Sequence, residues 1–295
     1  MKSSLPIVSI LIVGYNSEKH IENCLRSIPR DMRSSIELFF INNSNDSASE
    51  VVRSVYPDAL VVPTHGNVGF GAGVNLLASY ARAPYFLLLN PDAVIIGSSL
   101  QQLISAAVAD PCVGVWGGLA VLQSGEIDNA SVQDILTPSL LIRSIFGIHA
   151  KRVRSLADAQ LVASVVSGAF LLIRREAWLQ VGGFDQRFFL YAEEHDLCRR
   201  VSALGWKLRI LPAAKFHHDT GSGARRNPLR FEMRARGNVT YFRKYYGPAM
   251  SSACVVLIYA HALSRVFAGW TTGNRDLAIA YWQLVSRPRN WMNGW

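Results

Sequence analysis

The sequence predicts an α/β protein built on a mostly parallel central sheet flanked by helices. Three observations predict this class: apolar β-branched runs typical of strands buried on both faces, amphipathic segments between these runs, and short connections. Half of the 295 residues are hydrophobic and only 17% are charged. This composition excludes a disordered chain, because such chains have too little apolar surface to bury. The length allows one large domain or two small ones.

The first 120 residues alternate between expected strands and expected helices. The strands are the apolar runs Pro6–Val13, Glu37–Ile41, Leu60–Val62 and Tyr85–Leu89. The helices are Ser17–Ile28, Gly73–Ala83 and Ser98–Ala109, the last of which begins at a serine cap. Because this alternation is typical of parallel sheets, we expect a ligand at the carboxyl ends of the strands.

The second half of the chain is less regular. Its expected elements are a strand at Val115–Leu122, a loop over Ser124–Asp158 with a helix near Ser139–Phe146, a strand at Val162–Ile173, an amphipathic helix at Glu193–Leu204, a strand at Trp206–Leu211 and a basic helix at Asn227–Tyr246. The remaining residues are expected as apolar helix, interrupted by Gly247, Gly269 and Gly273. We therefore divide the chain into an α/β domain over residues 1–224 and a helical extension over residues 225–295.

Charge is distributed unevenly along the chain. Residues 1–198 carry 14 basic and 18 acidic side chains, whereas residues 199–295 carry 16 basic and three acidic ones. Such asymmetry indicates an anionic partner: a phosphate, a nucleic acid or lipid headgroups. The four cysteines form no Cys-x-x-Cys motif, so we expect reduced thiols rather than a metal clip.

Two segments near the expected strand ends carry polar or glycine residues. Asn90-Pro91-Asp92 follows a buried strand, where a carboxylate could hold a divalent cation on substrate phosphates, although these residues are also common in turns. Residues 66–73 are rich in glycine, which lets a backbone approach a ligand closely. The spacing is Gly-x-Gly-x-Gly and not that of a dinucleotide-binding loop, so we do not predict a dehydrogenase.

Three acidic residues, Glu193, Glu194 and Asp196, lie at the start of an expected helix. The helix dipole favours acids there, but three exceed what capping needs. The apolar residues 188–191 precede them, and an apolar environment raises the pKa of a carboxyl group and suits it to act as a base. His217 and His218 follow the strand Trp206–Leu211 and could ligate a metal or lie on the surface.

In this order the segments resemble glycosyltransferase family 2, which has the GT-A fold, and within it the rhamnosyltransferase-like group. The matching segments are Val8–Asn16, Asn42–Ser44 with Asp46, Asn67–Asn75, Leu88–Asp92, Gly168–Ala169, Gly182–Asp185, Phe188–Leu197, and His218 with Gly221. Each is weak alone, but the ordered set is specific. It implies a metal-dependent, inverting glycosyltransferase.

The resemblance also implies roles for single residues. Nucleotide-sugar binding falls on Val13, Tyr15, Asn42, Asn67, Gly69, Phe70, Asn75, Asn90, Arg226 and Arg230. Mg²⁺ or Mn²⁺ falls on Asp92 and His218, and the general base falls on Glu194, supported by Glu193 and Asp196. The chain departs from the family pattern at three positions: Asn42 and Asn90 stand where acids are usual, and Glu194 stands where the family has aspartate.

The implied reaction is a single displacement at the anomeric carbon. Basic side chains and a divalent cation stabilise the charge that grows on the leaving nucleoside diphosphate, while Glu194 removes the proton of the acceptor hydroxyl. The implied donor is a nucleoside-diphosphate sugar, first of all dTDP-rhamnose, and the implied acceptor is a polyprenyl-diphosphate-linked saccharide of bacterial surface polysaccharide synthesis. Two alternatives are a nucleotidyltransferase, whose phosphate loop after the first strand is not found, and a basic nucleic-acid-binding protein, which leaves the acids unexplained.

The basic extension carries two further expectations. Arg226, Arg230 and Arg234 recur every four residues, so they share a helix face suited to a diphosphate. No run of about 20 apolar residues is found, so residues 247–295 are expected to dock on the cytoplasmic face of the membrane rather than to cross it. The expected interfacial residues are Trp270, Tyr281, Trp282, Trp291 and Trp295. The alternative roles for these helices are to cover the α/β domain or to form a homodimer interface.

Overall fold

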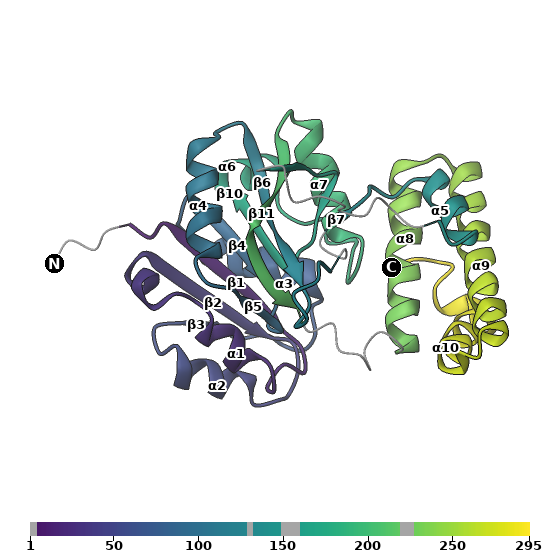
Figure 1. Ribbon diagram of the computed structural model, residues 1–295, viewed down its shortest axis with the longest axis horizontal. Helices are drawn as coiled ribbons and strands as arrows, with labels where there is room; N and C mark the ends of the chain where they lie inside the picture. The colour runs from purple at the N-terminus through teal and green to yellow at the C-terminus, as the bar shows by residue number, and fades with distance from the viewer. Residues whose placement is uncertain (1–4, 129–131, 149–159, 219–226) are drawn as a thin grey trace.

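The computed structural model describes residues 5–128, 132–148, 160–218 and 227–295. An α/β part and a group of helices lie side by side in it (Figure 1). The central sheet has the strand order β3-β2-β1-β4-β10-β6-β11-β5, and β8 also pairs with β11. The strands are β1 (Val8–Gly14), β2 (Ile36–Asn42), β3 (Leu60–Val62), β4 (Tyr85–Leu89), β5 (Ala93–Ile95), β6 (Val113–Val121), β8 (Leu161–Val162), β10 (Phe170–Arg174) and β11 (Lys207–His218).

The sheet is mostly parallel, with antiparallel members at defined places. β1 pairs parallel with β2 and β4, β2 with β3, and β6 with β11. β10 lies antiparallel between β4 and β6, while β5 and β8 run antiparallel to β11. The predicted α/β class with a parallel sheet is therefore confirmed. The pairing of β5 with the end of β11 places Ala93 opposite His218, which links two distant segments at one edge.

Helices cover both faces of the sheet because its central strands are apolar on both sides. Along β1, Val8, Ile10 and Ile12 face one core, and Leu11 and Val13 face the other. The first core is covered by α1 (Ile21–Arg26), α2 (Ala48–Val55) and α4 (Ser99–Ala109). The second is covered by α3 (Phe70–Tyr80), α6 (Arg175–Val181) and α7 (Glu193–Ala203). Two short strands, β7 (Val132–Gln133) and β9 (Val165–Val166), pair beside α7.

A third core joins the helical group to the α/β part. The group consists of α5 (Pro138–Ile145), α8 (Pro228–Tyr245), α9 (Pro248–Thr271) and α10 (Arg275–Ser286), drawn on the right of Figure 1. We call it the helical unit, together with residues 287–295. Its core includes Leu141 of α5 and also Phe188 and Ala192, which directly precede α7. The unit therefore packs against the segment that presents the three acids.

Several expected elements differ from the structure for physical reasons. The expected strand Val162–Ile173 is β8, β9 and β10, because its parts pair with three different neighbours. The expected strand Trp206–Leu211 continues to His218 through an irregularity between Leu211 and Lys215. The short elements α2, α6 and β5 were not expected.

The apolar helices also differ from the expectation. α9 runs through Gly269 without interruption. A side chain at this position would collide with Ala278 of α10, so the glycine allows the two helices to pack closely. Gly247 and Gly273 do bound α9 as expected. Among the described residues, α9 is long and apolar enough to cross a bilayer, with mean hydropathy 1.5 in an 18-residue window. No apolar run long enough to span a membrane was expected from the sequence, whereas α9 is long and apolar enough by length and composition.

Candidate active site

A depression of about 510 Å³ lies where β1 and β2 end. It is lined by Tyr15, Asn16, Asn43, Ser44, Asn45, Asp46, Gly66 and Asn67. These residues come from the loops after β1, β2 and β3, at the carboxyl ends of parallel strands, where ligands of open α/β sheets bind. Two predicted nucleotide-binding residues, Tyr15 and Asn67, are thus brought together. Val13 lies buried in β1 just below.

Asn42 shapes this depression from within. Its amide nitrogen donates to the Asp46 carboxylate at 2.8 Å, and its amide oxygen accepts from the backbone and hydroxyl of Ser44. Burial acts to raise the pKa of Asp46, but the hydrogen bonds from Asn42 and from the backbone of Glu18 and Ala48 lower it overall. The hydrogen bond between Asn42 and Asp46 therefore fixes the shape of the loop. The negative charge lies on Asp46, and both ends of the Asn42 amide are bound within the loop.

The glycine-rich loop connects this depression to the segment before α7. Gly69 has φ of 84°, its N–H is held by Asn67 at 2.9 Å, and its carbonyl accepts from Asn43 at 3.0 Å. A Cβ at Gly69 would lie 2.8 Å from the Phe189 ring, so only glycine fits there. The Phe70 N–H, at the start of α3, donates to the Phe189 carbonyl at 3.0 Å.

Asn75 is less suited to reach a ligand than its place in the motif indicates. Its amide donates to the carbonyl of Phe184 at 2.8 Å and accepts from the Phe184 N–H at 2.9 Å. Both ends of this amide are thus bound to one residue. Asn75 fixes the turn before the acidic segment.

The candidate metal centre lies at the junction of β4, β5 and β11. An Asp92 carboxylate oxygen is 3.2 Å from Nε2 of His218, and the Asn90 amide nitrogen is 3.3 Å from the same atom. The structure thus brings His218 next to Asn90 and Asp92, although 128 positions separate it from Asn90. Among the described residues no group of three or more His, Cys, Asp and Glu side chains gathers around one point.

These residues fit a cation that takes its other ligands elsewhere. One carboxylate oxygen and one imidazole nitrogen 3.2 Å apart have about the spacing of adjacent ligands on an octahedral ion with bonds of ~2.1 Å. Such ions keep several waters and share substrate phosphates, so one carboxylate suffices. The side chains of His218 and Asp92 are 18% and 23% exposed, which leaves them accessible to a ligand.

The acids at the start of α7 divide into two kinds. Glu193 is 5% exposed, and one carboxylate oxygen of Glu193 and one of Glu194 are buried without a hydrogen-bond partner in the described part of the chain. Burial, and for Glu193 also the charge of Glu194, raises the pKa of both carboxyl groups. Both are therefore suited to hold or accept a proton. The Glu194 backbone and the Arg234 charge oppose the rise at Glu194.

Asp196 is instead fully paired. It is 0% exposed, accepts from Arg200 at 2.7 Å and from the Tyr245 hydroxyl at 2.7 Å, and also binds Lys244. Lys244 in addition binds Asp185 at 2.7 Å. The support expected from Asp196 is thus structural: it fastens α7 to α8. Sequence reasoning missed Lys244 and Tyr245, whose only signal was the basic character of the helix.

Arginines of α8 lie near the acids. The guanidinium of Arg234 is 5.4 Å from the centre of the Tyr191 ring, and the Arg234 charge acts on Glu194 and His195. The charge of Arg230 acts on Tyr191. Arg226, Gly221 and the proposed domain boundary at residue 224 lie outside the described residues. Burial, with a smaller effect of Arg234, lowers the pKa of His195 to about 4, and its Nε2 is 3.0 Å from Gln133.

Several arginines of the last third are bound to groups of the fold. Arg236 binds the Asn290 carbonyl and Glu232, Arg243 binds carbonyls of Met292 and Asn293, and Arg265 binds carbonyls at the end of α5. The net charge therefore overstates the free cationic surface. This weakens the nucleic-acid-binding alternative, which depended on that charge.

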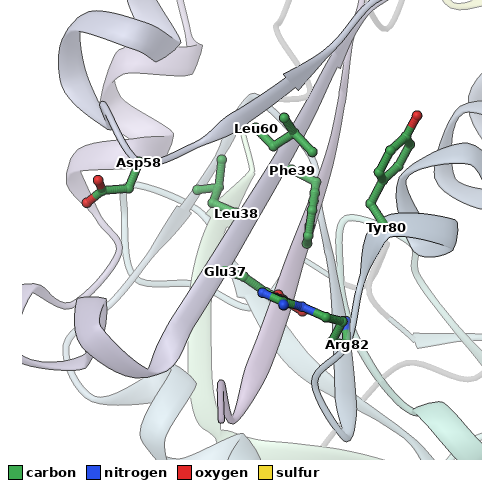
Figure 2. A pocket seen from close by; sticks show the side chains of 7 residues that line it. All are labelled: Glu37, Leu38, Phe39, Asp58, Leu60, Tyr80 and Arg82. Carbon is green, nitrogen blue, oxygen red and sulfur yellow. Dashed lines mark hydrogen bonds and ion pairs between the residues drawn. The ribbon is translucent and has the colours of Figure 1, made fainter. Parts of the chain in front are cut away.

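A second depression, of about 410 Å³, lies at the other end of β2 (Figure 2). Its lining includes Glu37, Asp58, Tyr80 and Arg82. Glu37 accepts from Ser9 and from the backbone of Arg82 and Ala83, and these bonds lower its pKa against the effect of burial. Glu37 is thus bound within the fold, and the depression lies at the amino end of a parallel strand, so we do not take it as the candidate site.

A family comparison decides between the alternatives. The model of "Glycosyl transferase family 2" matches residues 9–181, which is more than half of the chain. The chain belongs to glycosyltransferase family 2. This glycosyltransferase is 29% identical over 251 residues to the N-acetylglucosaminyl-diphospho-decaprenol L-rhamnosyltransferase of Mycobacterium tuberculosis, covering 77% of this chain and 80% of the relative. It is 24% identical over 229 residues to the rhamnosyltransferase WbbL of Escherichia coli K12, covering 73% and 86%.

Solved structures show the same fold. The mannosyltransferase PcManGT of Pyrobaculum calidifontis, solved with GDP-Man and Mn²⁺, matches 98% of this chain and 86% of its own with a TM-score of 0.60 and 17% identity. GalNAc-T7, solved with UDP, GalNAc and Mn²⁺, matches 73% of this chain and 44% of its own with a TM-score of 0.56 and 16% identity. The predicted GT-A fold and the resemblance to rhamnosyltransferase-like members of family 2 are thus confirmed.

Proposed function

We propose that this family 2 enzyme transfers a sugar, with L-rhamnose from dTDP-rhamnose as the first candidate, to a hydroxyl of a polyprenyl-diphosphate-linked saccharide, with inversion at the anomeric carbon. The relatives named for rhamnosyl transfer support the donor sugar, and the decaprenyl-diphosphate relative supports the acceptor class. Bacterial surface polysaccharide synthesis, including O-antigen, is the proposed setting.

The observation that carries this proposal is the packing around Phe70. Its N–H binds the carbonyl of Phe189, two residues before the strained turn that leads into α7. Its ring lies 3.5 Å from where a Cβ of Gly168 would be, and the next residue, Ala169, accepts the N–H of Asn90 at 3.0 Å. One residue, through its backbone N–H and its ring, thus connects the turn that carries Asp92 with the segment that carries Glu194. A donor diphosphate and an acceptor hydroxyl would meet between them.

Each group has a distinct task in the proposed reaction. Asp92 and His218 would hold Mg²⁺ or Mn²⁺, which supplies charge neutralisation for the leaving diphosphate. Tyr15, Asn67 and the loop held by Asn42 would receive the nucleoside. Glu194 accepts the proton of the acceptor hydroxyl, and its raised pKa lets it hold that proton. Burial also raises the pKa of Glu193 beside it.

Arg230 and Arg234 suit the acceptor rather than the donor. Their charges act on Tyr191 and Glu194, on the side of the proposed base, and both side chains are exposed. A diphosphate held there would place a lipid-linked saccharide with its hydroxyl toward Glu194. We therefore assign both arginines to the acceptor diphosphate, which moves Arg230 from the nucleotide-sugar role.

The test is an assay of the purified full chain with a panel of nucleotide sugars and a polyprenyl-diphosphate-linked N-acetylglucosamine. Mass spectrometry should detect a product heavier by one deoxyhexose with dTDP-rhamnose and a divalent cation, and NMR should show the inverted linkage. Transfer from another donor would replace rhamnose. Incorporation of a nucleotide rather than a sugar would favour the nucleotidyltransferase alternative and contradict the proposal.

We also propose that the helical unit lies on the cytoplasmic face of the membrane. Val256, Leu263, Phe267 and Trp270 recur along one face of α9 and are 43–72% exposed. Phe146, after α5, and Trp282, on α10, are exposed too. This corrects the expected anchors: Trp291 is 0% exposed and donates to the Leu284 carbonyl, so it cannot reach a bilayer. Trp270 and Trp282 remain suitable.

Liposome flotation tests this surface. The wild-type chain should float with vesicles that contain anionic lipid, and Phe267→Ser with Trp270→Ser should reduce flotation, while the matched double change Leu179→Ser with Leu204→Ser, at exposed apolar positions on the α/β part, should not. No flotation, together with a dimer in sedimentation that the first pair dissociates, would assign the face to a second copy instead.

A further inference from the structure

The backbone directly before α7 has an unusual conformation. Tyr191 and Ala192 both have φ of 67°, in the left-handed region that favours glycine. Ala192 is the N-cap residue of α7 and offers no side-chain hydrogen bond to the helix. Such a conformation persists only where the surroundings fix it. Because Glu193 and Glu194 follow at once, this turn determines where their side chains project.

Residues of the helical unit contact this turn at two points. The indole N–H of Trp295 donates to the Leu190 carbonyl at 3.2 Å, and the Trp295 ring lies 5.2 Å from the Phe189 ring. On α8, Gly237 approaches so closely that a Cβ there would overlap the Tyr191 carbonyl oxygen and lie 3.2 Å from the Leu190 oxygen. The glycine-rich loop contacts the residue before the turn as well, through the Phe70 N–H to the Phe189 carbonyl.

Trp295 is itself held firmly on α8. Its backbone N–H donates to the Thr240 hydroxyl at 2.9 Å, and the Arg236 guanidinium lies 5.2 Å from its ring centre. Arg236 also binds the Asn290 carbonyl and Glu232, so it ties residues 288–295 to the helix. The segment around the turn is therefore contacted both by the glycine-rich loop and by Trp295, which α8 holds in place.

We propose that Trp295 and Gly237 are positioning residues, which hold the Leu190–Ala192 turn in its left-handed conformation and thereby fix the Glu194 carboxylate relative to the acceptor hydroxyl. This rests on the proposed role of Glu194 as the base. The consequence is that the helical unit takes part in the chemistry through the turn. A misplacement of about 1 Å at a reacting group can cost up to ~100-fold in rate.

Two substitutions at Trp295 separate its contacts. Trp295→Phe keeps an aromatic ring against Phe189 but removes the indole N–H, and Trp295→Ala removes both. Trp291→Phe is the matched control, because it also removes an indole N–H bound to a carbonyl, at Leu284, away from the turn. Hydrogen exchange of the amides of residues 190–194 reports the turn, and kcat and KM report the reaction.

We expect faster exchange at residues 190–194 and a kcat about tenfold lower for Trp295→Phe, with a larger loss for Trp295→Ala and an unchanged KM for the donor. Trp291→Phe should lower the melting temperature but leave exchange at the turn and kcat near wild type. Exchange at the turn that is unchanged in both Trp295 variants, or a kcat that falls equally in Trp291→Phe, would overturn the proposal.

Gly237→Ala tests the second contact. We expect a kcat loss of up to ~100-fold, because the added Cβ must displace the Tyr191 carbonyl. Gly247→Ala is the matched control, because a Cβ there meets no atom within 4 Å. If Gly237→Ala does not fold, the Trp295 series still decides. Absence of transfer by the wild type would contradict the proposed function, whereas the exchange data would still show whether Trp295 holds the turn.

Discussion

The two polar ends of the candidate site differ in how far their side chains are paired. At the end of β4, Asp92 and His218 are partly exposed and contact each other and Asn90. At the start of α7, Asp196 is buried and bound by three side chains. Glu193 is buried and Glu194 is partly buried, and each has one buried carboxylate oxygen without a hydrogen-bond partner in the described part of the chain. The difference teaches that residue type alone does not assign a role. Accessible groups can bind a ligand, fully paired groups hold structure, and carboxyl groups with an unpaired buried oxygen have a raised pKa that suits proton transfer.

Removing the proposed base should have the largest effect on rate. Glu194→Gln keeps the size of the side chain but cannot accept a proton, so kcat should fall by ~10²–10⁴-fold. Steady-state kinetics with the transferred sugar as readout measures it. Asp196→Asn is the comparison, because it removes a structural acid of the same helix. Near-normal turnover by Glu194→Gln would assign the base to another carboxylate, with Glu193 the first to test.

Replacing the fully paired Asp196 carboxylate should have the largest effect on the free energy of unfolding. Asp196→Asn leaves Lys244 and Arg200 without their shared buried partner, and removal of one partner of a buried pair typically costs ~3–5 kcal/mol. Urea unfolding followed by fluorescence measures the loss. Glu22→Gln, at the exposed pair with Arg26, should change stability by less than ~1 kcal/mol. Equal effects of the two changes would mean that Asp196 is not the link between α7 and α8.

A pH profile separates the electrostatic role of Arg234 from that of a passive surface arginine. The Arg234 charge lowers the pKa of Glu194 against the effect of burial, so Arg234→Gln should raise that pKa. Because the base acts when deprotonated, the acid limb of the kcat profile should move to higher pH. Arg53→Gln, at an exposed position on α2 across the sheet from α7, is the control and should leave the limb in place. An unmoved limb in Arg234→Gln would remove this arginine from the site.

The sequence predicted the strands around the site better than the connections between them. Buried parallel strands such as β1 and β4 are continuous apolar runs in the sequence, so their ends could be located within a residue or two. β8, β9 and β10 were merged because an apolar run does not reveal that its parts pair with different neighbours. Nor can local pattern show that β11 bends onward to bring His218 to Asp92.

The motifs predicted the main residues of the candidate site but not the hydrogen bonds that hold them in place. Asp92, His218 and Glu194 were named from the sequence because their residue types carry chemistry. Asn42 and Asn75 were also predicted to bind the ligand, yet the Asn42 amide is bound within its own loop and the Asn75 amide is bound to Phe184. The links through Lys244 and Trp295 join residues 48 or more positions apart, which only the tertiary structure reveals. Long-range contacts of this kind leave no periodic signal.

The central claim is that Asp92 serves the donor and Glu194 serves the acceptor proton. Titration calorimetry of a nucleoside diphosphate with Mn²⁺ onto wild type, Asp92→Asn and Glu194→Gln tests it most directly. We predict that Asp92→Asn loses the Mn²⁺-dependent part of the affinity, whereas Glu194→Gln binds like wild type although it does not turn over. Wild-type affinity in Asp92→Asn, or lost affinity in Glu194→Gln, would contradict the account.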